Sequence, residues 1–259
     1  MELRIEHRTH YHYDKPLHYS IQQLRLTPQN GFGQQVKHWD VRVNGSVTCY
    51  ADTFGNISHT LVVDAPHNDI TITATGRVQT GLYNICQEHS LPLPVYLRST
   101  DLTHADSALT AFASTLNVQK SGLQERNVYQ IMQAIHDAVP YQGDMPQNKH
   151  NAAQAFALGA SSSHDYAHIF IACCRRLGIP TRYVSGYLFL PKSGSMINHG
   201  WVDVWLADAG WYSFDVASGQ RANGVHVRLA TGLDYKDACP IHSALQHSTA
   251  AQTISALAA

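Results

Sequence analysis

The sequence of 259 residues predicts an α+β fold, with a β-rich N-terminal domain over residues 1–80 and a mixed core domain over residues 81–259. Short alternating segments, typical of strands, dominate the first domain. Later segments have the spacing of amphipathic helices, and a buried helix over residues 163–177 is followed by three strand-like runs. We therefore expect a small β-sandwich or barrel, then a core in which a central helix packs on an antiparallel sheet.

Composition excludes several classes of protein. The chain is 44% hydrophobic and 14% charged, so it can bury a core. Lys and Arg number 18 against 19 Asp and Glu, which leaves no basic excess for nucleic acid or a membrane surface. There is no apolar run of about 18 residues, and the polar N-terminal segment lacks the apolar centre of a signal peptide. We expect a cytoplasmic protein whose five cysteines are free thiols.

The first eighty residues read as several short strands. Residues 3–6 and 41–43 alternate apolar and polar side chains, and residues 69–75 (DITITAT) do so strictly. Asn44-Gly45 directly follows the second run and predicts a hairpin turn. Phe54-Gly55-Asn56 predicts another turn. Strands at this spacing are typical of a sandwich or barrel.

Histidine is unusually frequent, at 17 residues, and clusters near the start of the chain. His10 and His12 would share one face of a strand, as metal ligands can. His7 and His18 flank them, but no cysteine or carboxylate completes a ligand set. We therefore rank a metal protein last among the functional hypotheses and expect no metal site.

Helices are expected after a connector marked by Pro92 and Pro94. Residues 102–116 and 123–138 have helical spacing. The second has an apolar stripe at positions i, i+3, i+4 and i+7, formed by Val128, Ile131, Met132 and Ile135. A loop rich in Gly, Pro and Asn follows over residues 141–151.

Residues 163–177 predict a buried helix that ends at Gly178 and Pro180. Its apolar side consists of Tyr166, Ala167, Phe170, Ile171, Cys174 and Leu177. Three runs then predict strands, over residues 181–190, 199–206 and 211–215. The tail after His247 is rich in Ala, Ser and Thr, and we expect it to fray.

The beginning of the buried helix is a candidate position for a nucleophile. Residues 161–165 (SSSHD) lie where the loop meets the helix. The positive end of the helix dipole and the unpaired N–H groups there lower the pKa of a thiol and can stabilise an oxyanion. Ser and Asp are also the preferred residues of an N-cap, and on this segment alone the cap is the better interpretation.

His199 and Asp215 lie on two consecutive predicted strands. An odd-length loop over residues 207–209 would place Trp201 opposite Asp215. His199 would then lie one diagonal step away on the same face, about 7–8 Å at Cα. An even loop would separate the two side chains onto opposite faces. In the odd register Asp215 could orient the imidazole and His199 could act as base and acid; the alternative is two polar residues at the ends of exposed strands.

Several blocks, in the same order, resemble bacterial transglutaminase-like proteins. Residues 159–188 (GASSSHDYAHIFIACCRRLGIPTRYVSGYL) are similar to the signature G-x-G-V-C-Q-D-F-A-H followed by C-R-x-L-G-I-P-A-R-Y-V-S-G-Y. Residues 198–219 resemble the blocks H-A-W-V-E-V and G-W-x-x-F-D-P-T, and residues 226–241 resemble the closing segment. The β domain that precedes the core in this family is matched by residues 7–16, 24–28 and 52–56. The resemblance implies a papain-like transglutaminase core.

The resemblance also implies a catalytic site. The family's base falls on His199, its orienting acid on Asp215, and its nucleophilic cysteine on Ser163, while His164 replaces the usual polar residue after the nucleophile. The family implies a thioester acyl-enzyme, formed from a glutamine amide or a peptide bond and resolved by an amine or water, without a cofactor. The expected partner is a peptide or protein amide. The residues expected to bind it are His164, Tyr166, Trp201 and Trp211.

Serine at position 163 changes the expected activity. A helix dipole contributes at most about 2 kcal/mol, or about 1.5 pKa units, which can hold a thiolate but cannot make an alkoxide. Ser163 would need His199 to remove its proton during attack, so we expect little or no activity. Cys173 and Cys174 lie roughly 15 Å along the helix and cannot replace the nucleophile.

Three explanations of the serine stay open. It is a substitution introduced to silence an enzyme, a natural loss that leaves a non-catalytic peptide- or protein-binding scaffold, or a working serine variant. Ser162 also replaces an apolar residue of the family pattern, and residues 141–146 depart from Y-x-P-G-x-T. These further differences are typical of a divergent branch with altered substrate contacts. The sequence does not indicate an oligomeric state.

Overall fold

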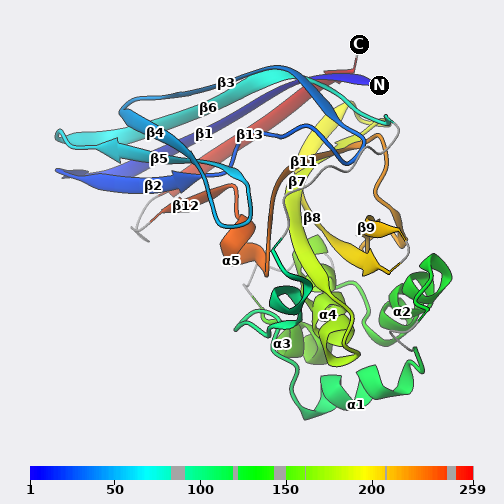
Figure 1. The fold of residues 1–259 in the computed structure, drawn as a ribbon. Coiled ribbons are helices and arrows are strands. Elements are labelled where there is room, and N and C mark those ends of the chain that lie inside the picture. The colour runs from blue at the N-terminus through cyan, green and yellow to red at the C-terminus, as the bar shows by residue number, and fades with distance from the viewer. Residues whose placement is uncertain are drawn as a thin grey trace.

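The computed structural model describes residues 1–82, 91–118, 122–142, 150–160, 162–207, 209–243 and 249–258. Figure 1 shows two regions, a pair of long sheets at one end and a group of helices at the other, joined by the strands β7 and β8. Helices and an antiparallel sheet therefore share the core, and a β-rich region precedes it. The predicted α+β class is confirmed.

The larger sheet follows the order β10-β9-β8-β13-β1-β6-β3, and β7 pairs with both β8 and β11. All of its pairings are antiparallel. Its strands are β1 (Glu2–Leu17), β3 (Gln35–Val43), β6 (His67–Gln79), β7 (Thr181–Leu190), β8 (Ser195–Leu206), β9 (Gly210–Asp215), β10 (Gln220–Arg221), β11 (His226–Gly232) and β13 (Thr249–Ala258). The three strands predicted after the buried helix are β7, β8 and β9.

The smaller sheet has the order β12-β2-β5-β4. Its strands are β2 (Ser20–Leu24), β4 (Ser46–Ala51), β5 (Ile57–Val63) and β12 (Ile241–Ser243). Apolar side chains of both sheets share one buried cluster, to which Ile5 and Ile72 come from the larger sheet and Leu24 and Leu61 from the smaller. The N-terminal region is thus two sheets packed face to face, as a sandwich requires.

The Asn44-Gly45 turn does not close a hairpin, contrary to the sequence prediction. The strand before it, β3, pairs with β6, whereas the strand after it, β4, pairs with β5. The turn therefore carries the chain from one sheet to the other. The Asn44 side chain donates to the Asp69 carbonyl at 3.0 Å and accepts from the Thr71 N–H at 2.8 Å, which holds the crossing point against β6. A Cβ at Gly45 would lie 2.7 Å from the Val62 carbonyl, so only glycine fits.

The C-terminal tail is a regular strand, contrary to the expectation that it frays. Strand β13 pairs with β1 along its length, from Leu3 opposite Ala258 to His12 opposite Thr249, and meets β8 at Ser195. Figure 1 shows it beside β1, so that the two ends of the chain lie together. Pairing depends on backbone groups, which small side chains leave accessible. The sheet is consequently continuous across the domain boundary predicted near residue 80, and that boundary stays a prediction.

The helices are α1 (Ser107–Thr115), α2 (Glu125–Ala138), α3 (Ala152–Leu158), α4 (Ser163–Arg176) and α5 (Tyr235–Ala238), with a 3₁₀-helix, η1 (Leu93–Leu97). The stripe predicted on α2 is buried as expected. Of the predicted loop over residues 141–151, residues 143–149 lie outside the described part, as does Cys86. In the described ranges, no helix combines the length and apolar character needed to cross a membrane.

Helix α4 is the central helix of the core, and almost every residue of it is buried. It packs on β7 and β8 on one side and on α1 and α3 on the other. Gly178, with a φ of 73°, ends it as predicted. Cys173 and Cys174 are buried and free, and burial raises the pKa of the Cys174 thiol to about 12. They are core residues and offer no thiolate.

Candidate active site

Ser163 is the first residue of α4, directly after the N-cap. The cap itself is Ser162, whose Oγ accepts from the Asp165 N–H at 3.3 Å; Ser161, which the sequence analysis included in this segment, lies outside the described residues. The Oγ of Ser163 accepts from the Gly200 N–H at 3.2 Å. The hydroxyl proton of Ser163 remains available to another acceptor, and the side chain is partly exposed.

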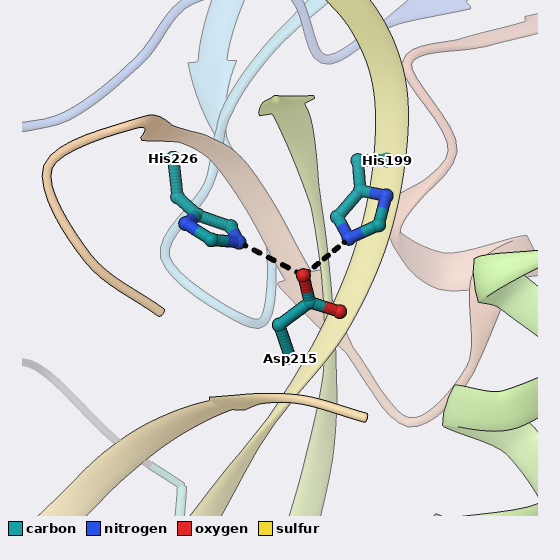
Figure 2. Close-up of side chains that lie close together, drawn as sticks. All are labelled: His199, Asp215 and His226. Carbon is teal, nitrogen blue, oxygen red and sulfur yellow. Dashed lines mark hydrogen bonds and ion pairs between the residues drawn. The ribbon is translucent and has the colours of Figure 1, made fainter. Parts of the chain in front are cut away.

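His199 and Asp215 lie together because β8 and β9 pair in the odd register. Leu206 lies opposite Gly210, which is the odd one of the two registers that the sequence left open. The Nε2 of His199 is 2.9 Å from the Oδ2 of Asp215 (Figure 2). Because Nε2 faces the carboxylate, Nδ1 is the imidazole nitrogen that does not face Asp215. Gly200, the residue next to His199, already contacts the serine.

Asp215 is a buried carboxylate, with only 1% of its surface exposed. Burial by itself would raise its pKa, but His199 and His226 outweigh this effect and hold the pKa of Asp215 well below its usual range. The other oxygen, Oδ1, accepts a longer bond of 3.4 Å from the Ser218 N–H. Asp215 is therefore ionised at neutral pH and can stabilise a charged imidazole.

His226 is the residue of this site that the sequence analysis missed. It begins β11, and its Nε2 lies 3.2 Å from the Oδ2 of Asp215, on the opposite side of that oxygen from His199 (Figure 2). Its Nδ1 accepts from the Asn223 N–H at 3.1 Å. The one feature of the sequence that could have indicated His226 is the family-like segment 226–241, which begins at this histidine. Nothing local to that segment points toward Asp215.

Two imidazoles and a carboxylate are also a common metal-ligand set, and the donor atoms of His199, Asp215 and His226 lie within 4.8 Å of one another. A ligating nitrogen must present a lone pair to the ion. The Nδ1 of His226 uses its lone pair to accept from Asn223, so the proton of the neutral ring is on Nε2. This pattern favours two hydrogen-bond donors on one carboxylate over an ion between three ligands.

A second cluster, formed by His164, Tyr183 and Gly200, adjoins Ser163. The Nδ1 of His164 shares a hydrogen bond of 2.5 Å with the Tyr183 hydroxyl, and burial, helped by the nearby His199, lowers the pKa of His164 to about 4. His164 is thus neutral at pH 7. A Cβ at Gly200 would overlap the Tyr183 hydroxyl and lie 2.6 Å from the Nδ1 of His164. Glycine here, where the family pattern has alanine, makes room for His164.

The aromatic residues predicted to bind substrate are largely buried. Tyr166 donates its hydroxyl to the Val139 carbonyl at 3.0 Å and is 5% exposed. Trp201 is 1% exposed and packs against both His199 and His226. Trp211 is 3% exposed and packs on Tyr96 in a separate cluster. Trp201 therefore packs behind the two imidazoles, whereas the position of Trp211, in a separate cluster, does not support its predicted role in substrate binding.

The N-terminal histidines lie away from these residues. His10 and His12 share a strand face, as predicted, and both contact the Oδ1 of Asp69, at 3.1 and 2.9 Å. His7 is on the other face, buried against Tyr187 at 2.6 Å, and His18 is exposed. Asp69 is thus a carboxylate beside them that the sequence did not indicate, but in the part of the chain that the structure describes the donor atoms of these residues do not all lie within 4.8 Å of one another.

Two family models match the chain. Residues 3–79 match the bacterial transglutaminase-like N-terminal region, and residues 111–216 match the transglutaminase-like superfamily. Ser163, His199 and Asp215 all fall within the second match. His226 lies beyond its end.

Known proteins resemble the chain over most of its length. An uncharacterized protein of Mycobacterium leprae is 25% identical over 264 residues, covering 92% of this chain and 91% of that protein. One from Mycobacterium tuberculosis is 25% identical over 268 residues, with coverages of 92% and 85%. The crystal structure of a candidate cysteine protease from Cytophaga hutchinsonii superimposes with a TM-score of 0.77, at 18% identity, over 99% of this chain and 90% of that one. At that identity the likeness shows the fold.

Proposed function

The chain joins a bacterial transglutaminase-like N-terminal region to a transglutaminase-like core, and from this premise we propose that Ser163, His199 and Asp215 form an acyl-transfer site for amide substrates. The observation that carries the proposal is the 2.9 Å contact between His199 and Asp215, next to the backbone N–H that contacts Ser163. In this arrangement Ser163 would be the nucleophile, His199 the base, and Asp215 the acid that orients the base, as in a catalytic triad.

The proposed reaction has two steps. The Oγ of Ser163 attacks the amide carbon while the Nδ1 of His199 takes the hydroxyl proton. Collapse of the tetrahedral intermediate breaks the C–N bond, and His199 returns the proton to the leaving amine. The resulting ester is resolved by water, which gives a carboxylic acid, or by an amine, which gives a new amide. Asp215 holds the ring and stabilises its positive charge in both steps.

We propose that turnover is slow because the nucleophile is an alcohol. No arrangement of helix dipole and N–H groups makes a serine ionise at neutral pH, so all activation must come from proton transfer to His199. The Gly200 N–H at 3.2 Å and the N-terminus of α4 favour partial negative charge on Oγ while its proton leaves for His199. The partner is a peptide or protein amide, and the chemistry needs no cofactor.

Restoring the thiol tests this function. Ser163→Cys is compared with Ser163→Ala and with the unmodified chain, using a glutamine-containing peptide with a fluorescent amine and, separately, with water as the acceptor. Product formation is followed by mass spectrometry. We expect Ser163→Cys to turn over at least about 100-fold faster than the unmodified chain, and Ser163→Ala to be inactive. Equal inactivity of all three proteins, each shown to be folded by circular dichroism, would contradict the proposal.

A non-catalytic scaffold is the second candidate, and the serine at the nucleophile position favours it. Such a protein would retain peptides in the cleft without cleaving them. Titration of the unmodified chain with the same glutamine peptide, measured by calorimetry, distinguishes the two functions. Binding together with an inert Ser163→Cys variant supports the scaffold.

A further inference from the structure

Asp215 contacts two imidazoles through a single oxygen atom. His199 approaches Oδ2 from β8 at 2.9 Å, and His226 approaches it from the start of β11 at 3.2 Å (Figure 2). His226 is 8% exposed and His199 is 7% exposed, so water reaches neither contact freely. A reaction that uses His199 needs one carboxylate, and the second imidazole calls for its own explanation.

The hydrogen bonds of His226 fix where its proton lies. The backbone N–H of Asn223 donates to the Nδ1 of His226 at 3.1 Å, and the backbone N–H of His226 donates to the Asn223 carbonyl at 3.0 Å. The turn is closed from both sides, so the ring has one orientation. A neutral imidazole that accepts at Nδ1 carries its proton on Nε2. His226 is therefore a fixed donor aimed at Asp215.

Without this donor, Asp215 would be poorly held. Among the described residues, its remaining contacts would be His199, whose charge changes during the proposed reaction, and the 3.4 Å bond from Ser218. A buried carboxylate that lacks donors rotates toward others or takes up a proton. Either response would remove the partner that orients His199.

We propose that His226 is a positioning residue of the acyl-transfer site, which holds the Asp215 carboxylate on His199 through a hydrogen bond to their shared oxygen. The inference rests on the proposed function of Ser163, His199 and Asp215, and adds a fourth side chain from a strand outside the matched core region. His226 acts through Asp215 and contacts neither Ser163 nor the reacting carbonyl. Trp201 supports it, with its ring edge-to-face on the imidazole at 5.2 Å.

The test uses the Ser163→Cys background, because a thiol reports on the imidazole even without turnover. His226→Leu removes the donor at similar volume, and His226→Gln keeps an N–H donor within reach of Asp215. Two quantities are measured: kcat and KM for the glutamine peptide, and the rate at which iodoacetamide alkylates position 163 at pH 7. Alkylation is followed by peptide mass spectrometry, because the exposed Cys49 also reacts.

We expect His226→Leu to lower kcat and the alkylation rate by roughly 10- to 100-fold, the range for a hydrogen bond to a charged acceptor. KM should stay within about twofold, since His226 acts on the orientation of His199 and not on the bound peptide. His226→Gln should restore most of both rates. His59→Leu, which removes another buried imidazole at a distance, is the matched control and should leave both rates unchanged. If His226→Leu does not fold, His226→Met replaces it.

Three results would overturn the proposal. The first is a His226→Leu variant with unchanged rates, and the second is a His226→Gln variant as impaired as His226→Leu. The third is one equivalent of zinc bound by the unmodified chain with micromolar affinity and lost in His226→Gln, which would make the three side chains ligands. A different outcome separates the two proposals. If Ser163→Cys shows no turnover but is alkylated fast, and His226→Leu lowers that alkylation rate, the positioning role is supported and the proposed reaction is contradicted.

Discussion

A single methyl group at position 200 should disturb the site. Gly200 follows His199 on β8, and its N–H contacts Ser163. A Cβ built there overlaps the Tyr183 hydroxyl and lies 2.6 Å from the Nδ1 of His164. Tyr183 is fully buried, so its ring cannot move into solvent. The substitution Gly200→Ala must therefore displace the pair formed by Tyr183 and His164.

The expected cost follows from that overlap. Extra methyl groups in a packed core usually destabilise by about 1–3 kcal/mol, and no left-handed backbone strain adds to it, because Gly200 does not have a positive φ. Tyr183→Phe removes the overlapping oxygen and loses a hydrogen bond worth about 1 kcal/mol. In the double variant the closest overlap of the new methyl group is gone, and the contacts with the Nδ1 of His164 and the Cζ of residue 183, at 2.6 and 2.9 Å, remain. We expect the double variant to be more stable than the sum of the single effects predicts, by at least about 1 kcal/mol.

The unfolding free energies of the parent, the two single variants and the double variant are measured by urea unfolding followed by tryptophan fluorescence. Gly224→Ala is the matched control, because its Cβ would meet its nearest neighbour at 3.4 Å, an ordinary contact. Additive effects of Gly200→Ala and Tyr183→Phe, or a Gly200→Ala variant as stable as the parent, would refute the packing argument. Reactivity of the thiol in Ser163→Cys should also fall with Gly200→Ala, since the displaced His164 adjoins that residue.

Three further outcomes follow from the structure. Burial lowers the pKa of His7 to about 4, whereas in the unfolded chain the imidazole binds a proton already as pH falls below about 6.5. Acidification from pH 7.5 to pH 5 therefore destabilises the folded protein through this residue. His7→Gln should remove about 2 kcal/mol of that loss, measured by urea unfolding at each pH. Asp203 lies between the buried guanidiniums of Arg182 and Arg228, at 2.8 and 2.6 Å, so Asp203→Asn should cost about 3–5 kcal/mol in unfolding free energy, and a loss below about 1 kcal/mol would contradict the network. Deleting residues 249–258 exposes the edge of β1 and should lower Tm by roughly 6–12 °C in calorimetry, whereas an unchanged Tm would mean that β13 contributes nothing.

Local patterns in the sequence were sufficient for the central helix and its sheet. The apolar side of α4, its serine cap and its terminal glycine are signals within residues 162–178, and the structure bears them out. The sequence reduced the pairing of β8 and β9 to two registers, odd and even, because loop length decides which residues face each other, and the structure shows the odd one. That register is what brings His199 to Asp215.

Contacts between distant segments could not be predicted in this way. Asn44-Gly45 has the local sequence of a hairpin, yet the strands on either side pair elsewhere, because the gain from joining two sheets outweighs the preference of a turn.

What the sequence by itself indicated was a candidate set, Ser163, His199 and Asp215, and its order along the chain, since side-chain periodicity and family-like blocks are properties of neighbouring residues. Only the tertiary structure decided that β13 completes the sheet and that His226 reaches Asp215. Strands pair through backbone groups, so the side-chain sequence of β13 gives little indication of its partner. Which residue donates the second hydrogen bond to a buried carboxylate depends on which strand the fold places beside it.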